Sequence, residues 1–340
     1  MKTTDRPLTI GLTYDLRSEY LANGYTEEQV AEFDTESTID ALVETITGLG
    51  LTVDRIGSSR ALCSRLVAGD RWDLVFNIAE GVGGRCREAH VPAILETYGI
   101  PYTFSDPLTC ALTLDKALAK RHIHHAGLRT PNFFLVTHVD DLANTPCCFP
   151  LFAKPNAEGT GKGIDGRSRI DGRDQLVTVC QSLIERGLGP VLVEEYLPGR
   201  EFTVGIWGTG ATAQVIGTME IDIKEAAGKV DYTYETKEKC EELVKYSTPP
   251  DDDLRARIED LALAAYRVLD CRDAGRVDIR LDILGEPAFI EVNPLAGIHP
   301  HHSDLPMIAT RAGLTYEELL GGILRSAFLR AGIAKEFPAR

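Results

Sequence analysis

A run of alternating polar and apolar residues late in the chain constrains the fold most strongly. In "GRVDIRLDILGEPAFIEVNPLAGIHP", residues 275–300, polar side chains recur at every second position before Gly285 and return as Glu291 and Asn293 after Pro287. Alternation with a period of two places one set of side chains on each face of a strand, and glycine with proline is typical of a turn. The stretch therefore predicts an antiparallel hairpin with one polar and one apolar face.

The polar face of this predicted hairpin carries oxygen ligands for a metal ion. Folding back about the turn sets Asp278 roughly opposite Glu291 and Asn293. Two carboxylates and an amide oxygen suit Mg²⁺, with Mn²⁺ as an alternative, because Mg²⁺ takes a few protein oxygens together with substrate phosphates. Arg276 would stand beside the ion as a separate cation for a reacting anion. A solvated, salt-bridged sheet face is the competing interpretation. The loop sequence Asn-Pro-Leu-Ala-Gly that follows favours the metal.

The first third of the chain alternates between strand and helix patterns. The segments "LTIGLTYD", "TESTIDALVETITGLG", "LTVDRIG", "SSRALCSRLVAG" and "WDLVFNIAEG" follow one another in that order. This order predicts a parallel sheet with crossover helices. Ligands of such sheets bind at the carboxyl ends of the strands, which here include Asp15, Asn77 and the loop 80–84.

From about Thr113 the pattern changes to short antiparallel strands mixed with helices. We expect helices over residues 114–127, 174–187, 252–270 and 315–333, and a charged loop through residues 224–250. A polar, glycine-rich loop over 158–163 follows Lys154 and could close over a polyphosphate. It is not a P-loop, because Asn156 and Gly163 replace the required Gly and Ser or Thr.

Composition excludes several classes of function. A net charge of −15 argues against a broad nucleic-acid surface, and no stretch approaches the length of a membrane span or a secretory signal. Eight cysteines without a Cys-x-x-Cys pair indicate reduced, mostly buried thiols in the cytoplasm, and the pair Cys147-Cys148 fits packing better than redox chemistry. The spacing of His299, His301 and His302 is not that of common zinc sites, so we expect them to line a loop.

Taken together, three segments in this order resemble an ATP-grasp enzyme and most closely the D-alanine–D-alanine ligase family. The resemblance covers nearly the whole chain, and its most specific parts are "LDKALAK", "FAKPNAEGTGKG", "VEEYLPGREFTV" and "GRVDIRLD…FIEVNPLAGIHPHHSDLP". It implies an α/β and α+β fold: an N-terminal Rossmann-like domain over 1–112, then a two-part ATP-grasp fold with a small subdomain over 113–200 and a large one over 201–340. It also implies a cytoplasmic homodimer that acts on small amino-acid or carboxylate substrates.

The resemblance implies a role for each matching position. The residues matched to ATP binding are Lys116, Lys154, Glu194, Glu195, Leu197 and Glu201. The residues matched to magnesium are Asp278, Glu291 and Asn293. Arg276 and the N–H of Gly297 match groups that stabilise the oxyanion of a tetrahedral intermediate, and Thr160 stands where the family loop has a serine. Ser303 matches a contact to a substrate carboxylate.

The departures from the family pattern fall in the amino-acid pockets. The family's His-Gly-x-Gly-Gly-Glu is here "EGVGGR", with Glu80 for histidine and Arg85 for glutamate. Glu238 stands where the family often has a tyrosine, and Glu36 is our candidate for the acid that holds the first ammonium group. The resemblance therefore implies an ATP-dependent carboxylate–amine ligase that forms a dipeptide or amide through an acyl phosphate and releases ADP and phosphate. The alternatives are a ligase for a different amino-acid or carboxylate pair, a kinase-like enzyme that stops at phosphoryl transfer, or a non-catalytic ATP-binding protein.

Overall fold

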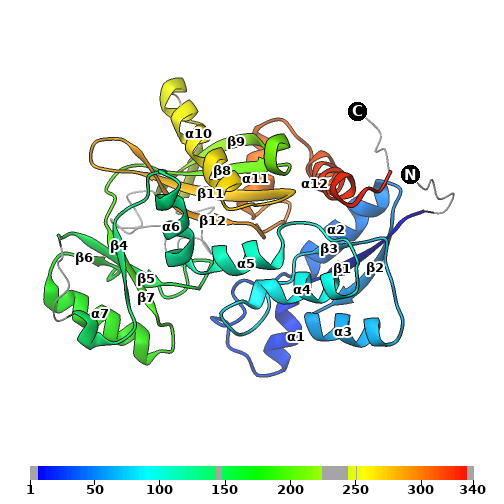
Figure 1. Cartoon of the computed structure of the whole chain (residues 1–340), viewed down its shortest axis with the longest axis horizontal. Helices are drawn as coiled ribbons and strands as arrows, with labels where there is room; N and C mark the ends of the chain where they lie inside the picture. The colour runs from blue at the N-terminus through cyan, green and yellow to red at the C-terminus, as the bar shows by residue number, and fades with distance from the viewer. Residues whose placement is uncertain (1–6, 143–147, 224–243, 250, 335–340) are drawn as a thin grey trace.

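The computed structural model describes residues 7–142, 148–223, 244–249 and 251–334, which form three sheets with helices packed against them (Figure 1). The strands are β1 (Thr9–Thr13), β2 (Thr52–Gly57), β3 (Leu74–Asn77), β4 (Phe133–Val136), β5 (Leu151–Pro155), β6 (Arg169–Ile170), β7 (Val191–Glu195), β8 (Glu201–Trp207), β9 (Gln214–Ile223), β10 (Val244–Ser247), β11 (Ala274–Leu281) and β12 (Pro287–Asn293). The α-helices are α1 (Arg17–Ala22), α2 (Glu36–Gly48), α3 (Ser59–Val67), α4 (His90–Thr97), α5 (Pro107–Leu114), α6 (Lys116–His125), α7 (Arg173–Glu185), α10 (Asp252–Val268), α11 (Asp304–Arg311) and α12 (Tyr316–Ala331). The short 3-10 helices are η1 (Arg87–Ala89), η2 (Val139–Leu142) and η3 (Gly210–Thr212).

The first sheet is parallel and has the strand order β2-β1-β3, which confirms the alternating pattern of the first third. Its polar strand ends hold the following loop in place. The hydroxyl of Thr13 donates to Asn77 Oδ1 over 2.8 Å, and Asp15 Oδ2 accepts the backbone N–H of Gly81 over 2.8 Å. Asp15 and Asn77 are both buried, so their role in the structure is to fix the loop after β3.

The second sheet is antiparallel, with the order β4-β7-β5-β6, and α7 packs against it. The loop that follows β5 is tied to the start of α6. Asn156 accepts the N–H of Lys116 with its backbone oxygen and the N–H of Ala117 with its side chain, over 3.0 and 2.9 Å. Asp115 caps the same helix by accepting the N–H of Leu118. Lys116 therefore has a fixed position beside the loop.

The third sheet is antiparallel, with the order β10-β9-β8-β11-β12, and it contains the predicted hairpin. Asp278 pairs with Glu291 and Arg276 pairs with Asn293, as the alternation predicted for Asp278 and Glu291. A bulge then shifts the register, so that Ile279 pairs with Phe289. The prediction of a loop through residues 224–250 was wrong in part, because β10 pairs with β9 inside that range. The rest of the range, 224–243 and residue 250, lies outside the described residues.

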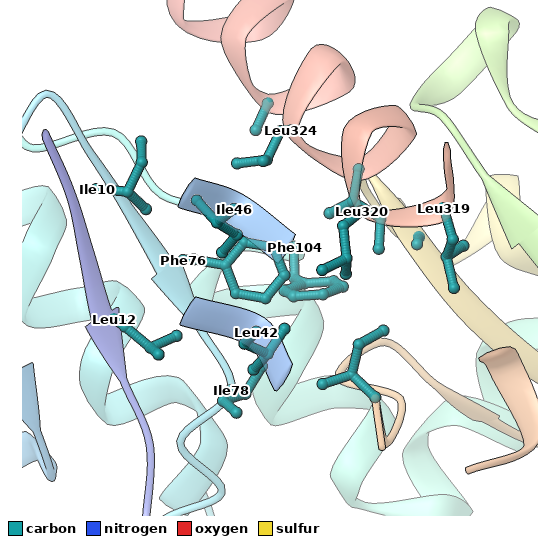
Figure 2. Close-up of a cluster of buried hydrophobic side chains, with 14 of the residues drawn as sticks. Ile10, Leu12, Leu42, Ile46, Phe76, Ile78, Phe104, Leu319, Leu320 and Leu324 are labelled. Atoms are coloured by element: carbon teal, nitrogen blue, oxygen red, sulfur yellow. The ribbon is translucent and has the colours of Figure 1, made fainter. Parts of the chain in front are cut away.

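The last helix of the chain completes the core of the first sheet. In Figure 2, Leu320 of α12 lies beside Phe104, which lies next to Phe76, and Leu319 and Leu324 belong to the same cluster of buried apolar side chains. Figure 1 shows α12 next to α2, far from the second sheet. Burial of such side chains is the main stabilising term of a fold. The beginning and the end of the chain therefore form one packed unit.

The buried carboxylate of Asp273, directly before β11, joins this unit to the third sheet. It accepts hydrogen bonds from Arg330 Nη2 over 2.7 Å, from the hydroxyl of Ser326 over 2.8 Å and from the N–H of Phe104 over 2.8 Å. A fully buried carboxylate is stable only when it is paired and hydrogen-bonded. These three partners come from α12 and from the segment before α5, so one side chain links three parts of the fold.

Two expectations from composition can be compared with the structure. No helix within the described ranges is both long and apolar enough to cross a membrane. Six cysteines are described and free, but only Cys110, Cys180 and Cys271 are buried, so the expectation of mostly buried thiols was too broad. Cys148 is exposed, and its neighbour Cys147 lies outside the described residues.

Candidate active site

Two adjoining cavities lie where the three sheets meet. Counting the space open to solvent, their volumes are about 880 and about 1060 Å³, which is ample for substrates of metabolite size. The first lies between the second and third sheets, and the second extends toward the first sheet. The residues that line both are Lys116, Glu158, Gly159, Arg276, Glu291 and Asp304.

Glu194 lies in the wall of the first cavity between two lysines. Its carboxylate oxygens are 2.8 Å from Lys154 Nζ and 2.9 Å from Lys120 Nζ. Glu194 is 4% exposed and Lys120 is 0% exposed. Burial alone would raise the pKa of Glu194, but the two ammonium groups hold this pKa below its usual value. Burial lowers the pKa of Lys120 to about 8. Glu194, Lys120 and Lys154 thus form a buried charge network. Removing one member would leave an uncompensated charge inside the protein and would destabilise the fold.

A flat polar and aromatic region follows the triad along the same cavity. The rings of Phe152 and Tyr196 stack with centroids 6.4 Å apart, and the Arg280 guanidinium lies 5.2 Å from the Tyr196 centroid. Arg280 Nη1 is also 3.4 Å from the carboxylate of Glu201. Glu195 and Leu197, which the resemblance matches to ATP binding, line this region as well. A planar ligand could stack on the ring of Tyr196, and hydroxyl groups of the same ligand could donate hydrogen bonds to the carboxylate of Glu201.

The hairpin supplies the opposite wall with alternating charges. Arg276 donates from Nε and Nη2 to the carboxylate of Asp278, over 3.1 and 3.2 Å, and from Nη1 to Asp304 Oδ2 over 2.7 Å. The carboxylates of Asp278 and Asp304 raise the pKa of Arg276 against the opposing effect of burial. Lys116 Nζ lies 3.3 Å from Glu291 Oε2 and donates to the backbone oxygen of Glu158 over 2.6 Å. Cations and carboxylates thus meet at the boundary between the cavities.

The donor set at this boundary fits a magnesium ion. Asp278 and Glu291 are register partners, and Asn293 Nδ2 lies 3.5 Å from Asp278 Oδ2, so three oxygen-bearing side chains share one face. In the described part of the chain, no three His, Cys, Asp or Glu side chains gather as a complete metal site. An ion here would therefore take two carboxylates, one amide oxygen and ligand oxygens, which is the usual coordination of Mg²⁺.

The histidines after β12 do not form a metal site in this structure. His299 Nδ1 accepts the backbone N–H groups of His301 and His302, both over 3.2 Å. That nitrogen is therefore used in the turn. His302 lines the second cavity, in agreement with the expectation that this segment lines a loop.

The loop after β5 lies against the N-terminal part of the chain. Arg87 donates from Nη1 to the backbone oxygen of Ala157 over 2.8 Å and lies 2.9 Å from Glu32 Oε2. A Cβ at Gly159 would come within 2.1 Å of Glu32, so the two segments are in close contact. Thr160, at φ 47°, has a buried hydroxyl with no hydrogen-bond partner among the described residues. Thr160 lines the second cavity, where a ligand could satisfy its hydroxyl after a side-chain rotation.

The predicted substrate residues divide into those that the structure brings to the second cavity and those that it does not. Glu80, Gly297 and Ser303 line this cavity, and Ser303 Oγ accepts the N–H of His299 over 2.9 Å. Glu36 does not line either cavity. It is exposed at the start of α2, 3.7 Å from Arg55, because the turn before α2 points it away from the loops. Glu238 lies outside the described residues.

Several site residues were missed in the sequence. Lys120 could have been found, because it follows Lys116 by four positions and therefore shares its helix face. Arg280 stands on the predicted polar face of the hairpin but was given no role, since its partner Glu201 comes from β8. Asp304 carries no local signal, because its partner Arg276 comes from β11. Arg85, a departure from the family pattern, lies 2.6 Å from the helix cap Asp115 and lines neither cavity.

Comparison with known proteins places these features in a family. The model of the D-ala D-ala ligase C-terminus matches residues 123–325. A D-alanine–D-alanine ligase of Bordetella petrii is 34% identical over 272 residues, which cover 79% of this chain and 79% of that protein. The chain belongs to the D-alanine–D-alanine ligase family. It is accordingly a ligase that forms C–N bonds.

Solved structures support the ATP-grasp fold of this family member. D-alanine–D-alanine ligase from Bacillus anthracis, solved in complex with ATP, aligns with a TM-score of 0.70 and 22% identity, covering 96% of this chain and 99% of that one. The VanG D-Ala:D-Ser ligase from Enterococcus faecalis aligns with a TM-score of 0.73 and 22% identity, covering 95% and 100%. The predicted fold class is therefore confirmed.

Proposed function

We propose that this ATP-dependent ligase joins the carboxylate of one amino acid to the amine of another through an acyl phosphate. The observation that carries the proposal is the shared wall of the two cavities, where Lys116, Arg276 and Glu291 face both spaces. A nucleotide in the first cavity and an amino acid in the second would meet at this wall. Holding two reactants in this way lowers the entropic part of the barrier.

We assign the first cavity to ATP. Tyr196 offers its ring to the purine beside the backbone of Glu195 and Leu197, and the carboxylate of Glu201 suits the ribose hydroxyl groups. Lys116 and Lys154 line the same cavity, and their ammonium groups suit the phosphate oxygens. The carboxylate of Glu194 orients Lys154 by its 2.8 Å ion pair, so we give it a positioning role.

We assign Asp278, Glu291 and Asn293 to Mg²⁺ or Mn²⁺, which when bound neutralises charge on the transferring phosphoryl group. The remaining steps belong to side chains and backbone groups of the chain. Three N–H groups of Arg276 bond Asp278 and Asp304, which leaves two of its five donors for a ligand. These donors and the N–H of Gly297 would stabilise the oxyanion that forms when the amine attacks the acyl carbon. Thr160 and its loop would exclude water from the acyl phosphate.

The proposal is tested with purified protein, ATP, Mg²⁺ and a panel of D- and L-amino acids, each supplied with hydroxylamine. Hydroxylamine attacks an acyl phosphate to give a hydroxamate and phosphate, so it reports activation of the carboxylate whatever the natural amine is. We expect hydroxamate and ADP in equal amounts, and a dipeptide by mass spectrometry when two amino acids replace hydroxylamine. A stable phosphorylated product would instead identify the kinase-like alternative, and ADP formed without any carboxylate would overturn the proposal.

A further inference from the structure

The second cavity is unusually rich in carboxylates, and most of them are neutralised. Six acidic side chains line it, against two cationic ones. Four of the acids have an ion-pair partner: Glu32 with Arg87 at 2.9 Å, Glu158 with Lys162 at 2.9 Å, Glu291 with Lys116 at 3.3 Å and Asp304 with Arg276 at 2.7 Å. The other two acids are Glu80 and Glu88.

Glu80 and Glu88 line the end of the cavity that the first sheet forms. Glu80 begins the loop after β3, and Glu88 lies in η1. Neither carboxylate has an ion pair or a hydrogen bond with any residue that the structure describes; Glu88 is 8% exposed and Glu80 is half-buried. A carboxylate that is buried without a partner is destabilising unless a ligand supplies the partner.

The electrostatics of the cavity agree with this geometry. Burial raises the pKa of Glu88 to about 7 although the Arg87 guanidinium opposes the shift, and burial together with the carboxylates of Glu88 and Glu32 raises the pKa of Glu80 well above its usual value against the same guanidinium. Lys116 is among the charges that act on Glu88, so the two acids lie close to the boundary where a carboxylate would be activated. A ligand that carries positively charged groups at this place would remove these penalties.

We propose that the amino acid whose carboxylate is activated carries a second basic group, and that Glu80 and Glu88 bind its two cationic groups. The inference rests on the proposed function and names the class of its first substrate, a diamino acid or a guanidino amino acid. The α-ammonium group of a neutral amino acid would compensate only one of the two acids. A second ammonium or guanidinium group on the side chain compensates the other.

The test uses hydroxamate formation with ATP, Mg²⁺ and hydroxylamine, and compares ornithine with norvaline and lysine with norleucine, in both enantiomers. In each pair the carbon chain is the same and only the terminal amine differs. The γ-phosphoryl group passes to the carboxylate oxygen with release of ADP, and hydroxylamine then displaces phosphate. We expect kcat/KM for the basic amino acid to exceed that for its neutral partner by 10- to 100-fold, in the range of a charged hydrogen bond in a buried site.

Two variants locate the effect. Glu88→Gln keeps the shape and removes the charge, so the basic-to-neutral ratio of kcat/KM should fall at least roughly tenfold, and Glu80→Gln combined with it should reduce the ratio further. Glu44→Gln, an exposed change on α2, is the matched control and should leave the ratio unchanged. Calorimetric binding of ornithine and norvaline in the presence of ADP gives a second readout that does not depend on turnover.

The outcomes separate this inference from the proposed function. A ratio at or below one in both assays would overturn the inference while hydroxamate from neutral amino acids still supported ligase activity. A high ratio that survives in the double variant would overturn the assignment to Glu80 and Glu88. Absence of hydroxamate from every amino acid would overturn the proposed function and this inference with it.

Discussion

Lys120 and Glu194 form an ion pair of 2.9 Å inside the protein, from α6 to β7, and Lys120 has no exposed surface. The same carboxylate also pairs with Lys154, so Lys120 supplies a second positive charge. In the proposed ATP site, this charge would let Lys154 contact a phosphate without leaving Glu194 uncompensated. The wall of the first cavity that contains Glu194 and Lys154 therefore depends on Lys120, which lines neither cavity.

Lys120→Met should destabilise the protein by about 3–5 kcal/mol, because it leaves a buried carboxylate with one partner instead of two. KM for ATP should rise roughly tenfold, since Lys154 is then held more tightly by Glu194. Urea unfolding and steady-state kinetics measure the two effects. Arg121→Met, an exposed change on the same helix, is the control. Adding Glu194→Gln to Lys120→Met should recover part of the lost stability, and simple additivity of the two changes would contradict the coupling.

Asp278→Asn should raise the magnesium concentration needed for half-maximal activity and lower kcat by roughly 100-fold. The amide keeps the shape of the side chain and Arg276 keeps its bond to Asp304, but Arg276 loses a charged partner. We therefore expect the free energy of unfolding to fall by about 2–3 kcal/mol. A magnesium titration of ADP release makes the measurement, with Asp260→Asn on the exposed side of α10 as the control. A normal magnesium dependence in Asp278→Asn would show that the ion binds elsewhere.

The raised pKa of Glu88 predicts how stability changes with pH in the absence of ligand. The folded protein holds this proton up to about pH 7, whereas an unfolded chain releases it near pH 4.5. The protonated carboxyl therefore stabilises the fold fully below pH 4.5. About 3 kcal/mol of the free energy of unfolding is lost as the pH rises to about 7. Glu88→Gln should reduce this slope, with the raised pKa of Glu80 accounting for what remains, and should be the more stable protein at pH 8. Parallel unfolding curves for the two proteins from pH 4 to 8 would contradict the assignment.

Gly297→Ala should disturb the substrate end of the site. A Cβ at this position would lie 2.8 Å from Ser303 Oγ, which already accepts the N–H of His299. We expect Ser303 to be displaced and KM for the amino-acid substrate to rise roughly tenfold while KM for ATP is unaffected. Gly48→Ala provides the control, because nothing lies within 4 Å of its added Cβ. Equal changes in both KM values would indicate a general effect on folding instead.

Local patterns in the sequence predicted the helices and the hairpin well. The pairing of Asp278 with Glu291 follows from period-two alternation and a turn marked by Gly285, both of which are read from neighbouring residues. The shift of register after Asp278, where Ile290 of β12 is left without a register partner on β11, could not be predicted, because no residue pattern in the hairpin marks it.

Contacts between distant segments set the limit of prediction. Glu36 was chosen as a substrate acid, but it is Glu32 that lies in the cavity, because the loop before α2 folds toward Arg87, 55 positions later. The buried partners of Glu194 come from α6 and β5, and no local pattern pairs them. The identity of the ligand-facing acids is therefore a property of the assembled fold.

The position of α12 has a consequence for biosynthesis. Phe76 and Phe104 emerge from the ribosome long before Leu319, Leu320 and Leu324, the side chains that cover them. The earliest sheet is consequently left with an open apolar face during most of translation, when nascent chains are prone to aggregate or to need a chaperone. A chain that ends before residue 316 would lack α12, and the apolar side chains that pack against this helix would stay exposed.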